Sequence, residues 1–264
     1  MIKQLEEVLN GASEIVKEGF LSNFELEFKS GKSNLVTSID KKSEQFIFNY
    51  ISKNFPSHGI LAEEGSNKVS SSEYTWVVDP IDGTTNFAHG LPLFSVSIGI
   101  LRNNEIVAGG ISDVMTNTLY ISEAGSGSTG NGVKIKVSER KTIDESLLVT
   151  GFPYNVKENP GNAFEIFSLI TKKARAVRRL GSAALDFCYV ANGVFDAFWE
   201  INLQPWDVCA GILLVKEAGG KISDYSNNNT TIYGKQVIAS NGLIHNELQK
   251  LIFQKFEEPV SKNL

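Results

Sequence analysis

The chain has 264 residues, with 25 lysines and arginines against 30 aspartates and glutamates, and a formal net charge of −5. Apolar residues make up 42% and charged residues 21%, which excludes an intrinsically disordered chain and predicts a large buried core. The acidic balance argues against a surface that neutralises nucleic-acid phosphates, so nucleic acid is not an expected partner. Small anionic substrates are not excluded, because bound cations can reverse the electrostatic field inside a site.

The first half of the chain is predicted to contain two amphipathic helices followed by an antiparallel sheet. Apolar side chains recur at helical spacing over 5–16 and 46–51, which predicts helices at the N-terminus and from Asp40 to Lys53. Runs rich in β-branched and aromatic residues then predict strands separated by turn residues, at 74–78, 94–101, 105–113 and 118–122.

From about residue 147 the pattern changes to strands that alternate with helices. The predicted fold class is therefore α+β, with an N-terminal α+β half over 1–143 and an α/β half over 144–264. No linker or repeat separates the halves, so we expect a single domain over 1–264. The predicted strands lie at 147–150, 175–180 and 194–200, and the helices at 162–173, 182–191 and 207–218, before two strands and a helix from about Ile244.

The cysteines and the apolar runs predict a cytoplasmic protein. Cys188 and Cys209 stand alone in apolar stretches without CxxC spacing, which predicts reduced, buried thiols. The first residues lack a signal-peptide pattern, and the apolar run 208–215 is too short to cross a bilayer.

Three local motifs have simpler interpretations than a ligand site. Residues 125–130 match GxGxxG, but the alternation over 131–137 predicts a strand where dinucleotide binding requires a helix, so we expect a hairpin turn. Residues 31–33 resemble the end of a P-loop, yet Leu26 stands where its first glycine is required. The basic stretch 172–179 lacks aromatic residues and is interpreted as a solvated helix end, with one arginine facing a substrate anion as the alternative.

The segment 76–87 carries the most informative chemistry. An apolar strand leads to Asp79 and Asp82, Gly83 permits a tight turn, and Thr84 stands where a helix can start. Two carboxylates beside free amide groups suit a divalent cation next to a phosphate. A turn with a helix cap is the alternative.

Three further acidic residues extend this pattern. Glu63 follows the apolar run 59–62, Asp207 stands near the start of a predicted helix, and Asp40 precedes the second helix. Helix capping is the simpler role for Asp40 and Asp207. The candidate ligands are all oxygen donors, which favours Mg²⁺, with Mn²⁺ possible, over zinc.

Two motifs make the chain similar to the inositol monophosphatase family. Residues 79–87, DPIDGTTNF, and residues 206–220, WDVCAGILLVKEAGG, look like the two signature motifs of that family. The residues EEG at 63–65 and RRLGSAA at 178–184 follow the family order, so the resemblance covers essentially the whole chain. It implies a Mg²⁺-dependent, lithium-sensitive phosphatase with a layered αβαβα sandwich fold, usually found as a homodimer.

The resemblance also implies roles for individual positions. The metal ligands match Glu63, Asp79, the Ile81 carbonyl, Asp82 and Asp207, which would hold two to three Mg²⁺ ions. Thr84 and Glu63 would orient the attacking water, and Asp40 matches an acidic residue near the third metal. The implied substrate contacts are Ile81, Asp82, Gly83, Thr84, Arg178, Gly181, Ser182, Ala183, Glu200 and Asp207.

The expected reaction is hydrolysis of a small phosphorylated polyol, most simply myo-inositol phosphate, by a metal-activated water. Glu200 supports a polyol because a carboxylate accepts hydrogen bonds from ring hydroxyls. Fructose 1,6-bisphosphate is an alternative substrate, since Arg178 or Arg179 could bind a second phosphate. Histidinol phosphate and bisphosphate nucleotides are further alternatives. A regulatory protein that contacts RNA machinery through 172–179 is the alternative of another class.

Overall fold

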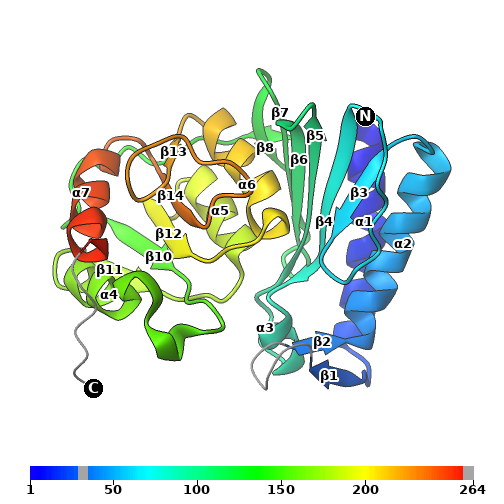
Figure 1. Cartoon of the computed structure of the whole chain (residues 1–264), viewed down its shortest axis with the longest axis horizontal. Coiled ribbons are helices and arrows are strands. Elements are labelled where there is room, and N and C mark those ends of the chain that lie inside the picture. Colours follow the sequence, from blue (N-terminus) through cyan, green and yellow to red (C-terminus); the bar gives the residue numbers. More distant parts are fainter. Residues whose placement is uncertain (29–34, 258–264) are drawn as a thin grey trace.

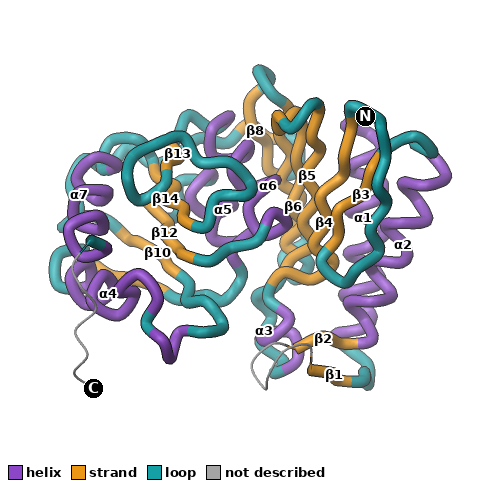
Figure 2. Tube along the Cα trace, in the orientation of Figure 1, coloured by secondary structure: helices purple, strands orange, loops and turns teal. Residues whose placement is uncertain are grey.

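The computed structural model describes residues 1–28 and 35–257, which form five layers in the order helix, sheet, helix, sheet, helix (Figures 1 and 2). The predicted αβαβα sandwich is confirmed. The P-loop-like residues 31–33 lie outside the described ranges. None of the helices in those ranges is both long and apolar enough to cross a membrane.

The first outer layer and the larger sheet come from the first half of the chain. Helices α1 (Ile2–Phe20) and α2 (Ser38–Asn54) cover one face of a seven-stranded sheet. Strands β1 (Leu26–Phe28) and β2 (Leu35–Thr37) form a separate two-stranded sheet, at the bottom of Figure 1. The strands of the larger sheet follow chain order and are antiparallel except for the parallel pair β3 and β4. They are β3 (Gly59–Ala62), β4 (Tyr74–Asp82), β5 (Ser95–Arg102), β6 (Glu105–Asp113), β7 (Thr118–Glu123), β8 (Gly127–Gly130) and β9 (Val133–Lys134).

The second half supplies a mixed five-stranded sheet with helices on both faces. Its strand order is β11-β10-β12-β14-β13, with parallel pairs beside β10 and antiparallel pairs beside β14. Helices α5 (Ala183–Ala191) and α6 (Pro205–Glu217) form the middle layer, and α4 (Ala163–Thr171) and α7 (His245–Phe256) form the other outer layer (Figure 1). The strands are β10 (Leu147–Thr150), β11 (Ala176–Arg178), β12 (Ala197–Ile201), β13 (Lys221–Ser223) and β14 (Gln236–Ser240).

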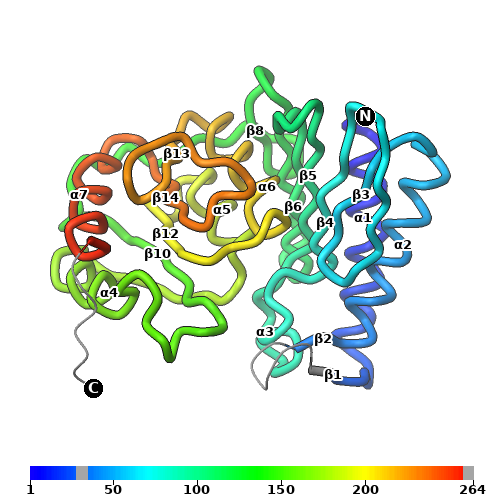
Figure 3. Tube along the Cα trace, in the orientation of Figure 1, coloured from blue at the N-terminus to red at the C-terminus, as the bar shows by residue number. Residues whose placement is uncertain are grey.

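Two glycines let helix α6 approach the seven-stranded sheet closely. Gly99 and Gly109 stand opposite each other on β5 and β6. A Cβ atom at Gly109 would lie 2.9 Å from the Ala210 Cα, and one at Gly99 would lie 2.2 Å from the Cys209 Sγ. The second half of the chain therefore packs its middle layer against the first sheet (Figure 3).

Besides small shifts in element bounds, the structure differs from the predicted elements in three places. Strand β4 does not end at Val78 but continues to Asp82, because a register shift in its pairing with β5 accommodates Pro80, which has no N–H group. The strand expected over 131–137 is limited to β9, since the Val137 amide leaves the sheet and donates to Ala218 of the α6 end. The β1–β2 hairpin was not predicted, while the hairpin turn predicted at 125–130 is confirmed.

Both cysteines are buried free thiols, as predicted. One histidine is also fully buried. His245 lies between two serine hydroxyls, with its Nε2 2.9 Å from the Ser223 Oγ and its Nδ1 2.8 Å from the Ser240 Oγ. Burial, with a smaller effect of Lys221, lowers its pKa to about 4.

We expect His245 to make the fold less stable in mild acid. Its folded pKa lies below the unfolded value near 6.5, so the unfolded chain binds the extra proton and stability is lost as pH falls from about 6.5 towards 4. Between pH 7 and pH 5 the wild type should lose about 2 kcal/mol more than His245→Gln, measured by urea unfolding. The difference between the two proteins isolates this residue from the carboxyl groups. An equal loss in both would contradict the assignment.

Candidate active site

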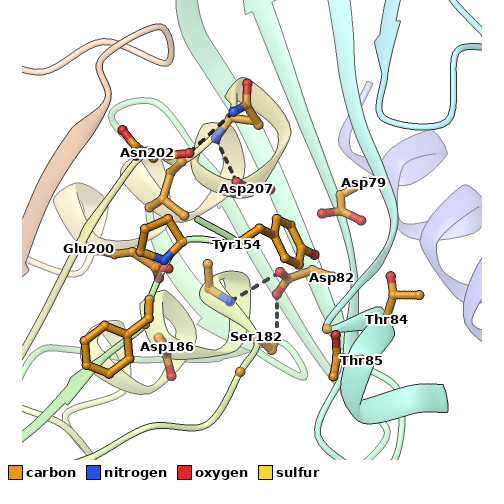
Figure 4. A pocket seen from close by; sticks show the side chains of 18 of the residues that line it. Asp79, Asp82, Thr84, Thr85, Tyr154, Ser182, Asp186, Glu200, Asn202 and Asp207 are labelled. Atoms are coloured by element: carbon orange, nitrogen blue, oxygen red, sulfur yellow. Dashed lines mark hydrogen bonds between the residues drawn. The ribbon is translucent and has the colours of Figure 1, made fainter. Parts of the chain in front are cut away.

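A cavity of about 830 Å³ opens between the two halves of the molecule (Figure 4). It is bounded by the end of β4, the start of α3 (Thr84–Ala88), the loop that follows β10, the segment 179–183 and the segment 200–207. Of the predicted site residues, eleven line it: Glu63, Asp79, Ile81, Asp82, Gly83, Thr84, Gly181, Ser182, Ala183, Glu200 and Asp207. Asp40 and Arg178 do not.

The end of β4 places two carboxyl groups at the cavity wall. Asp79 pairs with Ser97 of β5 and Asp82 with Ser95, so three steps on β4 match two on β5. This bulge turns both aspartates towards the cavity edge, although they are only 2% and 8% exposed. The Asp79 Oδ1 accepts a hydrogen bond of 3.1 Å from the Ile81 amide.

Asp82 also joins the two halves of the chain. Its carboxyl oxygens accept hydrogen bonds from the Ala183 amide at 3.2 Å and the Ala184 amide at 2.8 Å, and from the Ser182 hydroxyl. These amides belong to the first turn of α5, where a carboxylate is favourable for the helix dipole. The side chain thus fixes the segment 181–184 against the end of β4.

Behind the cavity, Asp40 supports Thr84. Gly83 has φ of 97°, a left-handed conformation that suits glycine, and α3 begins immediately after it. The Thr84 hydroxyl lies 3.0 Å from both the Ile81 carbonyl and the Asp40 Oδ1. Asp40 also accepts from the Thr37 amide at 2.8 Å in the capping box of α2, so it caps the helix and contacts Thr84 at once. Its pKa is raised to about 6, chiefly by burial.

Asp207 and Glu63 line the cavity from different halves of the chain. Helix α6 begins at Pro205, and Asp207 is its third residue rather than its N-cap: it accepts a hydrogen bond of 2.7 Å from the amide of the cap, Gln204. Glu63 follows β3 in a turn that the buried carboxyl of Glu44 holds, accepting from the Glu64 and Ser66 amides at 2.7 and 2.8 Å. Glu44 was not predicted, because its position on a helix gives no sign that it binds the Glu64 and Ser66 amides.

The carboxyl groups are strongly disfavoured in their charged forms. Burial raises the pKa of Asp79 and of Asp207 well above the usual value and that of Asp82 to about 6, and the surrounding carboxylates add to each shift. No lysine or arginine in the described ranges forms an ion pair with any of the three. Buried, uncompensated oxygen donors of this kind suit a hard divalent cation.

The carboxyl groups do not by themselves form a closed metal cage. In the part of the chain that the structure describes, no three side chains of His, Cys, Asp or Glu converge closely enough to enclose a cation. Each of the three aspartates accepts a hydrogen bond from a backbone amide. The donor set therefore fits Mg²⁺ in chemistry, and enclosing one requires these side chains to converge.

The side of the cavity opposite Asp79 is formed by the second half of the chain. Glu200 at the end of β12 lies there, in a space that exists because Gly151 has no side chain: a Cβ on Gly151 would lie 2.0 Å from the Glu200 Oε2. Arg178, the implied substrate contact, is exposed and its guanidinium donates to the Val177 carbonyl. The neighbouring Arg179 lines the cavity instead.

Two further residues enter the cavity without having been predicted. The Tyr154 ring lies between Asp82 and Asp207 in Figure 4. Although the residue is 59% exposed, desolvation inside the cavity and the surrounding carboxylates raise the pKa of its phenol. Asp186, on the first turn of α5, is 1% exposed and lies on the Glu200 side. Neither belongs to a motif, so only the three-dimensional fold identifies them.

Comparison with known proteins gives a consistent result. The model of the inositol monophosphatase family matches residues 1–261. An inositol-1-monophosphatase of Caulobacter vibrioides is 41% identical over 83% of this chain and 88% of its own length. A fructose-1,6-bisphosphatase/inositol-1-monophosphatase of Thermotoga maritima is 40% identical, with 88% of each chain covered.

The fold is shared as well. The crystal structure of the extragenic suppressor protein suhB of Bartonella henselae superposes with a TM-score of 0.91 at 35% identity, covering 95% of this chain and 97% of that one. The agreement of sequence and fold extends over nearly the whole length. The chain therefore belongs to the inositol monophosphatase family and is a phosphoric monoester hydrolase.

Proposed function

We propose that this protein hydrolyses the phosphomonoester of a small polyol, most simply myo-inositol phosphate, with Mg²⁺ as cofactor. The observation that carries the proposal is the group formed by buried Asp79 and Asp82 and half-buried Asp207, which lies beside the turn that starts α3 and forms no ion pair with the described residues. A phosphate could bind there between cations and the amides at Gly83 and Thr84. The names of the Caulobacter and Thermotoga relatives support this substrate class.

Glu63, Asp79, the Ile81 carbonyl, Asp82 and Asp207 would hold two to three Mg²⁺ ions, with Mn²⁺ as a possible substitute. Bound cations would supply Lewis-acid chemistry: they lower the pKa of a bound water and neutralise charge on the phosphoryl oxygens. The backbone hydrogen bonds to Asp79, Asp82 and Asp207 hold these carboxyl groups at the cavity wall, from which they would converge on the cations.

The chain's own groups would orient the nucleophile and the alcohol. The Thr84 hydroxyl, which is hydrogen-bonded to Asp40, would contact the attacking water together with Glu63. Glu200 and the segment Gly181, Ser182 and Ala183 would contact the alcohol part of the substrate. Cys188 and Cys209 are buried outside the cavity lining, so neither is placed as a nucleophile, and direct attack by water is the mechanism that we propose.

A bisphosphate substrate is the second candidate, and Arg179 favours it. Among the cavity-lining residues that the structure describes, Arg179 is the only lysine or arginine. A guanidinium at the alcohol side could bind a second phosphate. The Thermotoga relative is named for both activities.

Phosphate release from a panel of substrates tests the function. We expect Mg²⁺-dependent release from myo-inositol 1-phosphate with kcat/KM at least about tenfold above fructose 1,6-bisphosphate, histidinol phosphate and 3′-phosphoadenosine 5′-phosphate. EDTA should abolish the activity and added Mg²⁺ restore it. Preference for the bisphosphate that is lost in Arg179→Ala would favour the second candidate. Absence of Mg²⁺-dependent release from every compound would refute the enzyme assignment.

The family resemblance extends the proposal to inhibition by lithium, a cytoplasmic location and assembly as a homodimer. Inhibition of phosphate release by LiCl but not NaCl, and the mass in solution by light scattering, address the first and last of these.

A further inference from the structure

The alcohol side of the cavity contains two buried carboxyl groups that lack hydrogen-bond donors. The Oδ1 of Asp186 has no hydrogen-bond partner, although its residue is only 1% exposed. Glu200, 8% exposed on the same side of the cavity, receives no hydrogen bond from the described residues either. Buried acceptors are normally satisfied, so the Asp186 Oδ1 is an exception among the described residues that needs an explanation.

Other buried carboxyl groups of the chain show the usual pattern. Asp196, away from the cavity, accepts hydrogen bonds from the Ser138 hydroxyl, the Leu147 amide at 2.8 Å and the Arg140 guanidinium at 3.2 Å. At the other end of the cavity, Asp82 accepts from two amides and a hydroxyl. A buried carboxyl without donors costs stability, and such a cost is commonly retained where a ligand completes the hydrogen bonds.

We propose that Asp186 is a further specificity-determining residue of this site, which together with Glu200 binds hydroxyl groups of the alcohol part of the substrate. The inference rests on the proposed phosphatase function and deepens it by assigning the recognition of the polyol. Hydroxyl groups match these acceptors because each one both donates and accepts, so it satisfies a carboxyl group in either protonation state.

The surroundings of Asp186 support this assignment. The charged groups that face it are Glu200, Asp82 and Arg179. Asp82 is already held by the first turn of α5, and Arg179, an exposed residue, lies against Gly181. Among the described residues, Arg179 forms no ion pair with Asp186 or Glu200. The two carboxyl groups therefore keep acceptors free for a substrate rich in hydroxyl groups.

Asp186→Leu tests the proposal, because leucine keeps the branching of the side chain and removes the acceptors. We expect kcat/KM for myo-inositol 1-phosphate to fall at least about tenfold, mainly through KM, and kcat/KM for p-nitrophenyl phosphate, whose alcohol part has no hydroxyl group, to stay within about twofold. The melting temperature should stay the same or rise. Asp186→Asn, which keeps one acceptor, should fall between the wild type and the leucine variant.

Asp196→Leu is the matched control, since it removes a buried carboxyl that is fully hydrogen-bonded. It should lower the melting temperature without changing the ratio of the two substrates. The proposal is overturned if the ratio of kcat/KM for myo-inositol 1-phosphate to kcat/KM for p-nitrophenyl phosphate is the same in Asp186→Leu as in the wild type. If the leucine variant does not fold, the same ratio is measured in Asp186→Asn. A wild type that releases no phosphate from either substrate refutes the proposed function first. One that hydrolyses only p-nitrophenyl phosphate refutes the polyol assignment alone.

Discussion

Asp82→Asn should reduce Mg²⁺-dependent turnover by about a thousandfold or more while the protein stays folded. Asp82 is proposed as a metal ligand, and an amide is a much weaker ligand for Mg²⁺ than a carboxylate. Its oxygens also fix the first turn of α5 through the Ala183 and Ala184 amides. Asparagine retains one acceptor for these amides, so the segment 181–184 should remain close to its place.

We expect the fold to tolerate the loss of the charge of Asp82. Burial and the nearby Glu63 raise the pKa of this carboxyl to about 6, against the effect of its hydrogen bonds, so its charged form is disfavoured without a cation. Thermal unfolding in EDTA should therefore differ little between the variant and the wild type. Asp113→Asn, a buried carboxyl outside the cavity lining, serves as the control and should retain kcat. Unchanged kcat in Asp82→Asn would remove this residue from the metal site.

Gly109→Val should destabilise the protein by about 3 kcal/mol. The added Cβ would lie 2.9 Å from the Ala210 Cα and 3.2 Å from its carbonyl oxygen, and this helix backbone cannot rotate away as a side chain could. Relief requires α6 to move off the sheet. Because Asp207 is on the first turn of α6, activity should fall as well as stability.

Gly130→Ala is the control for this prediction, since its Cβ would meet no atom closer than 3.5 Å and its backbone is extended. It should change stability by less than about 0.5 kcal/mol. Urea unfolding measures both variants. If Gly109→Val unfolds at the same urea concentration as the wild type, the close approach of α6 is not important for stability.

The sequence predicted most of the elements and of the cavity carboxyl groups because both depend on local patterns, whereas the layered sandwich was implied by the family resemblance. Alternation and helical spacing identify the elements, and the end of an apolar strand identifies Asp79 and Asp82. The start of α6 was predicted two residues late, at Asp207, although Pro205 at the first helical position is a signal for the true start.

Local sequence patterns do not predict other features of the site. Arg178 is the last residue of β11 and Arg179 follows the strand, so a difference of one residue decides which side chain reaches the cavity. The missing donors of Asp186 depend on what packs around α5 from distant parts of the chain. Such properties follow only from tertiary contacts.

The close packing of α6 on the first sheet has a consequence for how the molecule is made. The ribosome synthesises the seven strands before residues 205–217. The sheet face around Gly99 and Gly109 therefore lacks α6, the helix that packs on it, until late in synthesis. Asp207 arrives with that same helix. The groups proposed to bind the cations are therefore complete only after α6 has been synthesised, and a chain that stops before residue 205 lacks Asp207.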